Sequence, residues 1–318
     1  MSTGDTRLIA IDWGTSSLRG ARLDAEGRAL EERGFGRGIL GVVPGTFPAV
    51  FAECFGDWLT VPPGPGSAQP VPQGSLASPN APCLISGMAG SRQGWVEAPY
   101  CPCPAGFGEV AQALSWIEPG RIAVVPGLST NAGTGTDAVP DVMRGEEVQV
   151  FGAMQLGSLR DGLFVLPGTH SKWVRVQGGR ITGFRTFMTG EFYALLSKHS
   201  LLARSLAADA PFDAAAFLDG TARAHGGAGL LHTAFGTRTL DLFGRRDGAA
   251  LASYLSGLVI GEELRSGAAE PGEPVVLIGS PTLTARYAQA FGAQGHAATT
   301  FGAEATWAGL HALAGALR

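Results

Sequence analysis

The chain has 318 residues, 45% of them hydrophobic and 16% charged, with a formal net charge of −4. This length suits two domains or one large domain with a sizeable core, and a negative charge without a long basic run argues against a nucleic-acid-binding protein. No apolar stretch reaches the roughly 18 residues of a membrane span, and the polar residues 1–7 lack the apolar region of a signal peptide, so a cytoplasmic protein is expected.

The first predicted element is a strand–turn–strand segment near the N-terminus. An apolar run over 8–11 ends at Asp12, and a second alternating run covers 18–23. The turn between them is built from small and hydroxyl-bearing residues: Gly14, Thr15, Ser16 and Ser17. Such a turn can bind phosphate oxygens through its N–H groups and hydroxyls, and the carboxylate can hold Mg²⁺. An ordinary β-hairpin with a polar turn is the alternative.

The rest of the first half alternates short apolar runs with loops. The patterns predict a helix over 48–58, strands over 83–85 and 122–125, and a small-residue loop over 127–135. Residues 61–82 are rich in Pro, Gly, Ser and Ala and carry no charge, which is typical of a surface loop or insertion. Asp141 is predicted to cap a helix that begins there.

One glycine motif in this half does not predict a dinucleotide site. A G-x-G-x-x-G pattern occurs at Gly36, Gly38 and Gly41. It follows the charged run 31–33, which is not a convincing strand, and it leads into Val-Val-Pro instead of a helix. The context that a dinucleotide fold requires is therefore missing.

The second half opens with an echo of the first segment. An apolar run over 163–166 enters a turn with Gly168, Thr169 and His170, and an alternating strand leaves it over 173–176. Gly168-Thr169 repeats Gly14-Thr15 about half a chain later. This internal repeat suggests two similar halves, which would bind a nucleotide between them.

The remaining patterns predict helices over 190–202, 211–223, 251–264 and 303–317. A buried strand over 275–278 runs into a turn with Gly279 and Ser280 and then into a helix. The missing side chain of Gly279 permits close approach of a base or ribose, although glycine is also common at ordinary strand-to-helix turns. Mixed strands and helices with buried strands indicate an α/β fold.

Several of these segments resemble a known superfamily. I-D-W-G-T-S-S-L-R resembles the first phosphate motif of the sugar kinase, heat-shock ATPase and actin superfamily, L-P-G-T-H-S-K its second, and V-V-L-I-G-S-P-T-L-T-A-R-Y its adenosine motif. The ordered set M-A-G-S-R-Q-G-W-V-E-A-P-Y, V-M-R-G-E-E, P-G-T-H-S-K-W-V, R-T-F-M-T-G-E and L-T-A-R-Y is similar to the 2-dehydro-3-deoxygalactonokinase family.

The resemblance implies a fold and an activity. It implies two similar ribonuclease H-like domains, each a mixed sheet flanked by helices, with the active site in the interdomain cleft. The expected N-terminal domain spans 1–145 and is joined by the C-terminal helix 303–318, and the nucleotide-binding domain spans 146–302. The implied reaction is ATP-dependent phosphorylation of the C6 hydroxyl of 2-dehydro-3-deoxy-D-galactonate. The alternatives are the gluco epimer, another sugar, or a phosphatase of the same superfamily.

The resemblance also implies roles for the nucleotide-binding residues. Asp12 is expected to organise Mg²⁺. The residues expected to hold ATP are Gly14, Thr15, Ser16, Ser17, Gly168, Thr169, His170, Lys172, Gly279, Ser280 and Thr282. For Lys172, a solvated strand position is the alternative.

On the substrate side, a carboxylate at a loop-to-helix junction is expected to accept the hydroxyl proton. Asp141 is the predicted general base, with Asp137 as competitor and plain helix capping as the alternative. An arginine is expected to bind the carboxylate of the sugar acid, and Arg92 and Arg144 are the candidates. Trp95 is expected on the apolar face of the sugar, or else in the core, and Glu191 is expected at the sugar hydroxyls. The partner is a small-molecule sugar acid, and a homodimer is one option for assembly.

Overall fold

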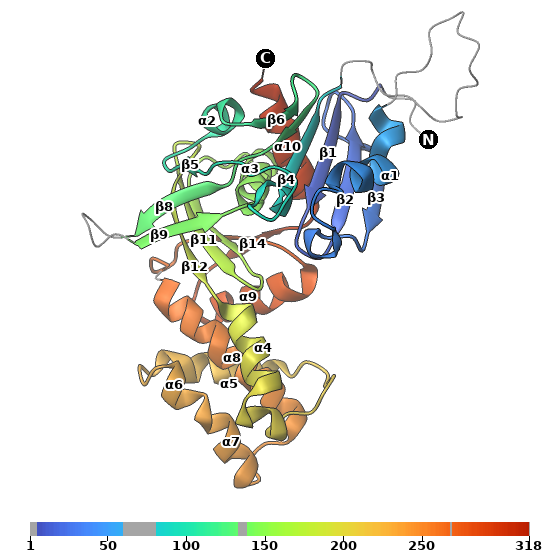
Figure 1. Cartoon of the computed structure of the whole chain (residues 1–318). Coiled ribbons are helices and arrows are strands. Elements are labelled where there is room, and N and C mark those ends of the chain that lie inside the picture. The colour runs from blue at the N-terminus through green and yellow to red at the C-terminus, as the bar shows by residue number, and fades with distance from the viewer. Residues whose placement is uncertain (1–4, 60–80, 133–138, 268, 318) are drawn as a thin grey trace, which may run out of the picture. The chain divides into compact units, whose positions relative to one another are not determined.

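The computed structural model describes residues 5–59, 81–132, 139–267 and 269–317. These residues form two compact units (Figure 1). The first comprises the described parts of Met1–Asp161, Val176–Gly183 and Ala303–Arg318, and the second comprises Gly162–Arg175 and Phe184–Gly302. Almost all of the predicted loop 61–82 lies outside the described residues, and so does Asp137.

The first unit is built on a six-stranded sheet with the order β3-β2-β1-β4-β7-β6. β1 pairs antiparallel with β2 and parallel with β4, and β4 pairs parallel with β7. The strands are β1 (Leu8–Trp13), β2 (Leu18–Leu23), β3 (Ala29–Phe35), β4 (Cys83–Gly87), β6 (Ser115–Glu118) and β7 (Ile122–Val124). A smaller sheet has the order β5-β8-β9 and contains β5 (Cys101–Pro102), β8 (Leu128–Ala132) and β9 (Val139–Met143).

Helices cover both faces of the larger sheet. α1 (Phe47–Leu59) buries Phe51 and Phe55 against Ile11 and Trp13 of β1. α10 (Glu304–Gly315) contacts β1, β2 and β4 and packs closely on α3 (Glu146–Gly157). The remaining helical pieces of this unit are α2 (Phe107–Gln112) and the 3₁₀ turns η1 (Ile39–Gly41) and η2 (Met88–Gly90). Because both faces are covered, β1 is apolar along nearly its whole length.

The second sheet has the order β12-β11-β10-β13-β14, with β10, β13 and β14 parallel. Its strands are β10 (Gly162–Leu166), β11 (Ser171–Gln177), β12 (Arg180–Phe187), β13 (Val275–Ile278) and β14 (Ala298–Phe301). Strands β3-β2-β1-β4-β7 of the first unit have the corresponding order. In both sheets the first three strands along the chain lie side by side, with the third strand at the edge. The predicted α/β fold with two similar mixed sheets is therefore confirmed.

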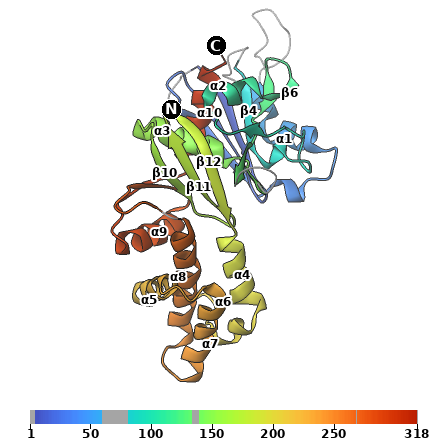
Figure 2. The ribbon, with the colours of Figure 1, turned by 90° about the vertical axis from the view of Figure 1, so that its left-hand side faces the viewer.

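The second unit also carries a group of helices. α8 packs against both α5 and α4 (Figure 2). The helices are α4 (Thr189–His199), α5 (Ala214–His225), α6 (Leu230–Thr233), α7 (Phe235–Leu242), α8 (Gly248–Gly267) and α9 (Pro281–Ala293), with the 3₁₀ turn η4 (Leu201–Ser205) after α4. Most of the predicted helices are thus confirmed, with ends shifted by a few residues. Among the described residues, every helix is too short or too polar to cross a membrane.

Three local predictions are wrong. The charged run 31–33 lies within β3, an edge strand whose side chains alternate toward solvent, so charges are tolerated there. Part of the expected loop 127–135 forms β8, which pairs antiparallel with β9. Asp141 lies within β9 opposite Thr130, and α3 begins five residues later at Glu146. Local pattern alone does not reveal a pairing partner.

Helix α3 belongs to the first unit, although the sequence predicts a domain boundary after residue 145. The contact with α10 uses two glycines. A Cβ on Gly152 would lie 1.7 Å from the Ala305 carbonyl oxygen, and a Cβ on Gly309 would lie 2.0 Å from that of Val148. Such close backbone approach ties the C-terminal helix to α3. The predicted domain boundaries stay a prediction.

Candidate active site

The first predicted phosphate turn lies between β1 and β2 in the first unit. The turn is closed by a hydrogen bond from the Gly14 N–H to the Ser17 carbonyl, at 2.9 Å. Thr15, Ser16 and Ser17 are all exposed, so their hydroxyls are accessible to a ligand. Asp12 stands at the base of the turn, and its Oδ2 is 2.5 Å from Nη2 of Arg19.

A glycine from the rejected dinucleotide motif supports this turn. The Ile39 N–H donates to the Gly14 carbonyl at 3.0 Å. A Cβ on Gly38 would lie 2.2 Å from the Thr15 carbonyl oxygen and 2.3 Å from the Ser16 nitrogen. Only glycine fits here without moving the turn. The glycine motif includes Gly38 but does not reveal this role, because the contact joins residues more than 20 positions apart.

Two further glycines lie beside Asp12. Gly87 ends β4 with φ of +90°, and a Cβ there would lie 3.3 Å from Oδ1 of Asp12. Gly145 precedes α3 with φ of +105°, and a Cβ on it would lie 3.3 Å from the Gly87 Cα. The hydroxyl of Ser86, in register with Asp12, is buried and has no hydrogen-bond partner in the described structure. A side chain in place of Gly87 would therefore crowd Oδ1 of Asp12.

The start of α3 adds two carboxylates to this region. The Arg144 N–H donates to Oε2 of Glu146 at 2.9 Å, and the Gly145 N–H donates to Oε2 of Glu147 at 2.7 Å. Glu147 is completely buried. Burial, reinforced by Glu146, raises the pKa of Glu147 to about 8, although the Gly145 hydrogen bond and Arg144 act in the opposite direction. Neither glutamate was predicted as a site residue, and the loop-to-helix junction assigned to Asp141 lies here instead.

Asp141 has a different setting from the one predicted for it. It lies in the middle of β9, and its Oδ1 accepts the N–H of Val142 at 2.8 Å. It is partly buried. Asp141 was predicted as the base because a position at a helix start was expected for it, and the structure does not place it there. Its role as base stays a prediction.

The predicted substrate residues of the first unit have unequal access to solvent. The Arg92 side chain is 86% exposed and lies 3.5 Å from Glu97. Arg144 is buried, donates to the Ala98 carbonyl at 2.7 Å and stacks on Tyr100, while its Nε and Nη1 have no partner among the described residues. Trp95 packs against Trp13 and Phe51 in the core cluster of the first unit.

The second predicted phosphate turn lies in the second unit and rests on the start of α4. The Glu191 N–H donates to the Thr169 carbonyl at 3.1 Å. A Cβ on Gly190 would lie 2.5 Å from the Gly168 carbonyl oxygen. Nε2 of His170 is 2.6 Å from Oε2 of Glu191. Glu191, predicted at the sugar hydroxyls, is thus placed beside the phosphate turn.

Lys172 follows this turn but does not extend into solvent. It is 6% exposed, and its Nζ donates to the hydroxyl of Thr186 at 2.7 Å. The alternative of a solvated strand position is therefore wrong for Lys172. Its contribution to phosphate binding stays a prediction.

The predicted adenosine segment lies next to the second turn. A Cβ on Gly279 would lie 3.5 Å from the Pro167 carbonyl oxygen, since β10 and β13 are parallel neighbours. Ser280 is the N-cap residue of α9, and Thr282 is exposed in its first turn. A pocket in this unit is lined by residues from the turn and three helices, among them Gly168, Tyr193, Ile260, Leu283 and Arg286.

Two similar sheets, each with a hydroxyl-bearing turn after its first strand, agree with the two-domain fold that the motifs predict, and the family match identifies the class as carbohydrate kinase. The chain belongs to the 2-keto-3-deoxy-galactonokinase family, whose model matches residues 12–313. It is 34% identical over 314 residues to the 2-dehydro-3-deoxygalactonokinase of Escherichia coli strain K12, an alignment that covers 98% of each chain. The family resemblance predicted from the motifs is confirmed.

Two further comparisons agree. A Rhizobium meliloti protein provisionally named as the same kinase is 35% identical over 320 residues, covering 97% of this chain and 96% of that one. The crystal structure of a protein from Sinorhizobium meliloti, provisionally described as a 2-dehydro-3-deoxygalactonokinase, superposes with a TM-score of 0.82 at 34% identity. That superposition covers 96% of this chain and 98% of the other.

Proposed function

We propose that this protein transfers the γ-phosphate of ATP to the C6 hydroxyl of 2-dehydro-3-deoxy-D-galactonate. The observation that carries the proposal is family membership along nearly the whole chain, with curated relatives matched over almost their full lengths. Phosphoryl transfer requires alignment and charge neutralisation more than covalent chemistry. The first turn offers the exposed hydroxyls of Thr15, Ser16 and Ser17 for that purpose, and the second offers that of Thr169.

Mg²⁺ is the proposed metal, and Asp12 is its proposed protein ligand. Mg²⁺ prefers hard oxygen ligands and commonly uses one or two carboxylates together with substrate phosphates and water. The carboxylate of Asp12 beside exposed hydroxyls fits that preference, and a side chain in place of Gly87 would crowd its Oδ1. Arg19 holds the other oxygen. When bound, the metal would neutralise charge on the transferred phosphoryl group.

Asp141 stays the proposed base, and Glu146 is the competitor that the structure adds. Both are partly exposed, and Glu146 lies at the start of α3, where the predicted base was expected. The glutamine and asparagine variants separate the two. Asp141→Asn is expected to abolish turnover while leaving ATP binding nearly intact. Glu146→Gln is expected to retain turnover. Wild-type-like kcat in Asp141→Asn would overturn the assignment and leave Asp137 and Glu146 as the candidates.

Arg92 is the proposed ligand of the sugar-acid carboxylate because its guanidinium is accessible. Arg144 remains the second candidate, with a buried guanidinium that already supports Ala98 and Tyr100. Arg92→Met is expected to raise KM for the sugar acid while KM for ATP stays unchanged. A normal KM for the sugar acid in that variant would favour Arg144.

The activity is tested by incubating the protein with Mg²⁺, ATP and a panel of keto-deoxy sugar acids while ADP is followed. ADP release only with the galacto acid is the expected result. Equal rates with the gluco epimer would broaden the substrate class. ADP release that ignores the sugar would contradict a kinase and favour a phosphatase. A cytoplasmic location and a homodimer remain predictions, the latter testable by light scattering.

A further inference from the structure

A buried carboxylate in the second unit lies behind the second phosphate turn. Glu263, on α8, is 3% exposed. Its Oε1 accepts the indole N–H of Trp173 at 2.7 Å, and its Oε2 accepts the hydroxyl of Tyr287 at 2.6 Å. The carboxylate therefore joins α8 to β11 and to α9, the helix that begins at the adenosine segment.

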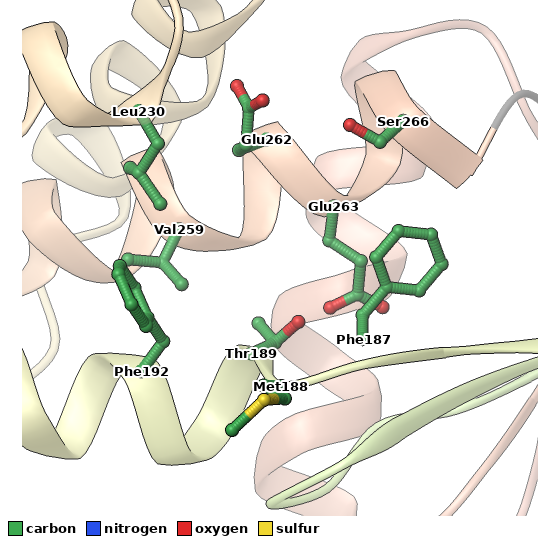
Figure 3. Close-up of a pocket in the computed structure, with 9 residues that line it drawn as sticks. All are labelled: Phe187, Met188, Thr189, Phe192, Leu230, Val259, Glu262, Glu263 and Ser266. Carbon is green, nitrogen blue, oxygen red and sulfur yellow. The ribbon is translucent and has the colours of Figure 1, made fainter. Parts of the chain in front are cut away.

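The Glu263 carboxylate is also linked to the start of helix α4 and to the end of the turn 168–171. The side chain of Thr189 hydrogen-bonds to Glu263, and Ser171 is linked to Glu263 through Tyr287. Thr189 begins α4, on which the turn rests, and Ser171 ends the turn. Figure 3 shows the Glu263 carboxylate directed toward Thr189, whereas the carboxylate of Glu262 points away. Both glutamates line a pocket of about 240 Å³ in this unit, and its lining residues are drawn in Figure 3.

The hydrogen bonds around Ser171 have a common direction. Because Tyr287 donates to Glu263, its oxygen is free to accept from Ser171, whose Oγ is 3.1 Å away. Oγ of Ser171 in turn accepts the Gly168 N–H at 3.4 Å, a long hydrogen bond. The network thus runs from the turn's first backbone N–H to a carboxylate that only accepts.

Burying this carboxylate is expensive unless donors surround it, and apolar residues of similar size would often stabilise the fold as well or better. Burial raises the pKa of Glu263, while hydrogen bonds from Thr189, Tyr287 and Trp173 act against that rise. The burial of Glu263 is therefore better explained by the geometry that its hydrogen bonds maintain than by a gain in stability.

We propose that Glu263 is a positioning residue for ATP, acting through Ser171, Tyr287 and Thr189 to fix the turn 168–171 for phosphate binding. The inference rests on the proposed function, since it assumes that this turn binds ATP. Glu263 itself contacts neither nucleotide nor sugar acid. Its loss should weaken ATP binding and leave the affinity for the sugar acid unchanged.

The test compares the full-length wild type with Glu263→Gln, Tyr287→Phe and the control Glu262→Gln. The control makes the same substitution one position away, at a side chain that pairs with Arg265 on the surface. ATP binding in the presence of Mg²⁺ and without sugar acid is measured by titration calorimetry, and KM is measured for both substrates. Glu263→Gln is expected to weaken ATP binding about tenfold, the scale of one lost charge-assisted hydrogen bond. Tyr287→Phe is expected to weaken it several-fold.

A purely structural role predicts something else. It would lower the melting temperature and the active fraction but leave the ATP affinity of the folded protein at the wild-type value. That result, or equal ATP affinities in Glu263→Gln and Glu262→Gln, would overturn the inference. If Glu263→Gln does not fold, Tyr287→Phe decides by the same criterion.

The outcomes also separate this inference from the proposed function. A wild type that binds no ATP would overturn both. A wild type that binds ATP but phosphorylates no sugar acid would remove the proposed reaction, while weakened ATP binding in Glu263→Gln would still support the role of Glu263.

Discussion

Asp12 on β1 and Arg19 on β2 are paired residues of one hairpin, and their side chains form an ion pair with 2.5 Å between Oδ2 and Nη2. Both side chains are partly exposed, so the pair contributes little to stability, on the order of 1 kcal/mol or less. Its effect is on geometry, because it holds one carboxylate oxygen while the other faces Gly87.

Asp12→Asn should therefore impair activity far more than stability. Because Asp12 is the proposed Mg²⁺ ligand, the loss of its charge is expected to lower kcat by about 100-fold or more and to raise the Mg²⁺ concentration needed for half-maximal activity. The melting temperature should change by only a few degrees. Kinetics across a Mg²⁺ series and a thermal scan measure both. An unchanged Mg²⁺ dependence would remove Asp12 from the metal site.

Gly87→Ala should disturb Asp12 as well as the backbone. The left-handed φ of +90° and the 2.8 Å approach to the Trp13 carbonyl oxygen predict a loss of about 2 kcal/mol or more in the free energy of unfolding. Gly120→Ala is the matched control, because Gly120 also has positive φ, +73°, but a Cβ added there would have no atom within 4 Å. It should lose about 1 kcal/mol and keep full kcat. Equal kcat in the two variants would show that Gly87 does not shape the site.

Glu147 should make the stability of the protein depend on pH. Its pKa in the folded state is about 8, above its ordinary value of 4.5. Between these values the folded state holds a proton that the unfolded state has released, so stability falls as pH rises, by at most about 1.4 kcal/mol per pH unit from this group. Below pH 4.5 both states are protonated and the contribution is complete.

Glu147→Gln removes this titration, and the variant should gain stability relative to wild type as pH rises from 4.5 to about 8. Urea denaturation across this range measures the difference, with Glu32→Gln, at an exposed position of β3, as the control that keeps the wild-type slope. A Glu147→Gln variant with the wild-type slope would contradict the raised pKa.

Gly152→Ala should weaken the packing of α10 on α3. A new Cβ only 1.7 Å from the Ala305 carbonyl oxygen forces the helices apart, which is expected to lower the free energy of unfolding by about 3 kcal/mol. Gly108→Ala is the control. Gly108 lies in α2 with open space around it, and alanine there should be neutral or stabilise by up to about 1 kcal/mol. Equal denaturation midpoints for the two variants would show that the close contact is not required.

Much of the fold could be predicted because its signals are local. The apolar runs that form β1, β10 and β13 are buried strands in the structure, and the helical periodicity over 251–264 lies within α8. The failures at β3, β8 and Asp141 share a cause. Each depends on pairing with the neighbouring strand along the chain, β3 with β2 and β8 with β9, and this pairing overrides the local preference of charged or small residues.

The sequence by itself determined the family, the doubled architecture and the positions of the two candidate phosphate turns, because ordered motifs and periodicity lie in neighbouring residues. Only the tertiary structure decided which distant groups serve those turns. Gly38 and Gly87 lie against the first turn, and Glu263 lies behind the second. The physical reason is that close approach and buried hydrogen bonds depend on how strands and helices pack, which no local pattern specifies.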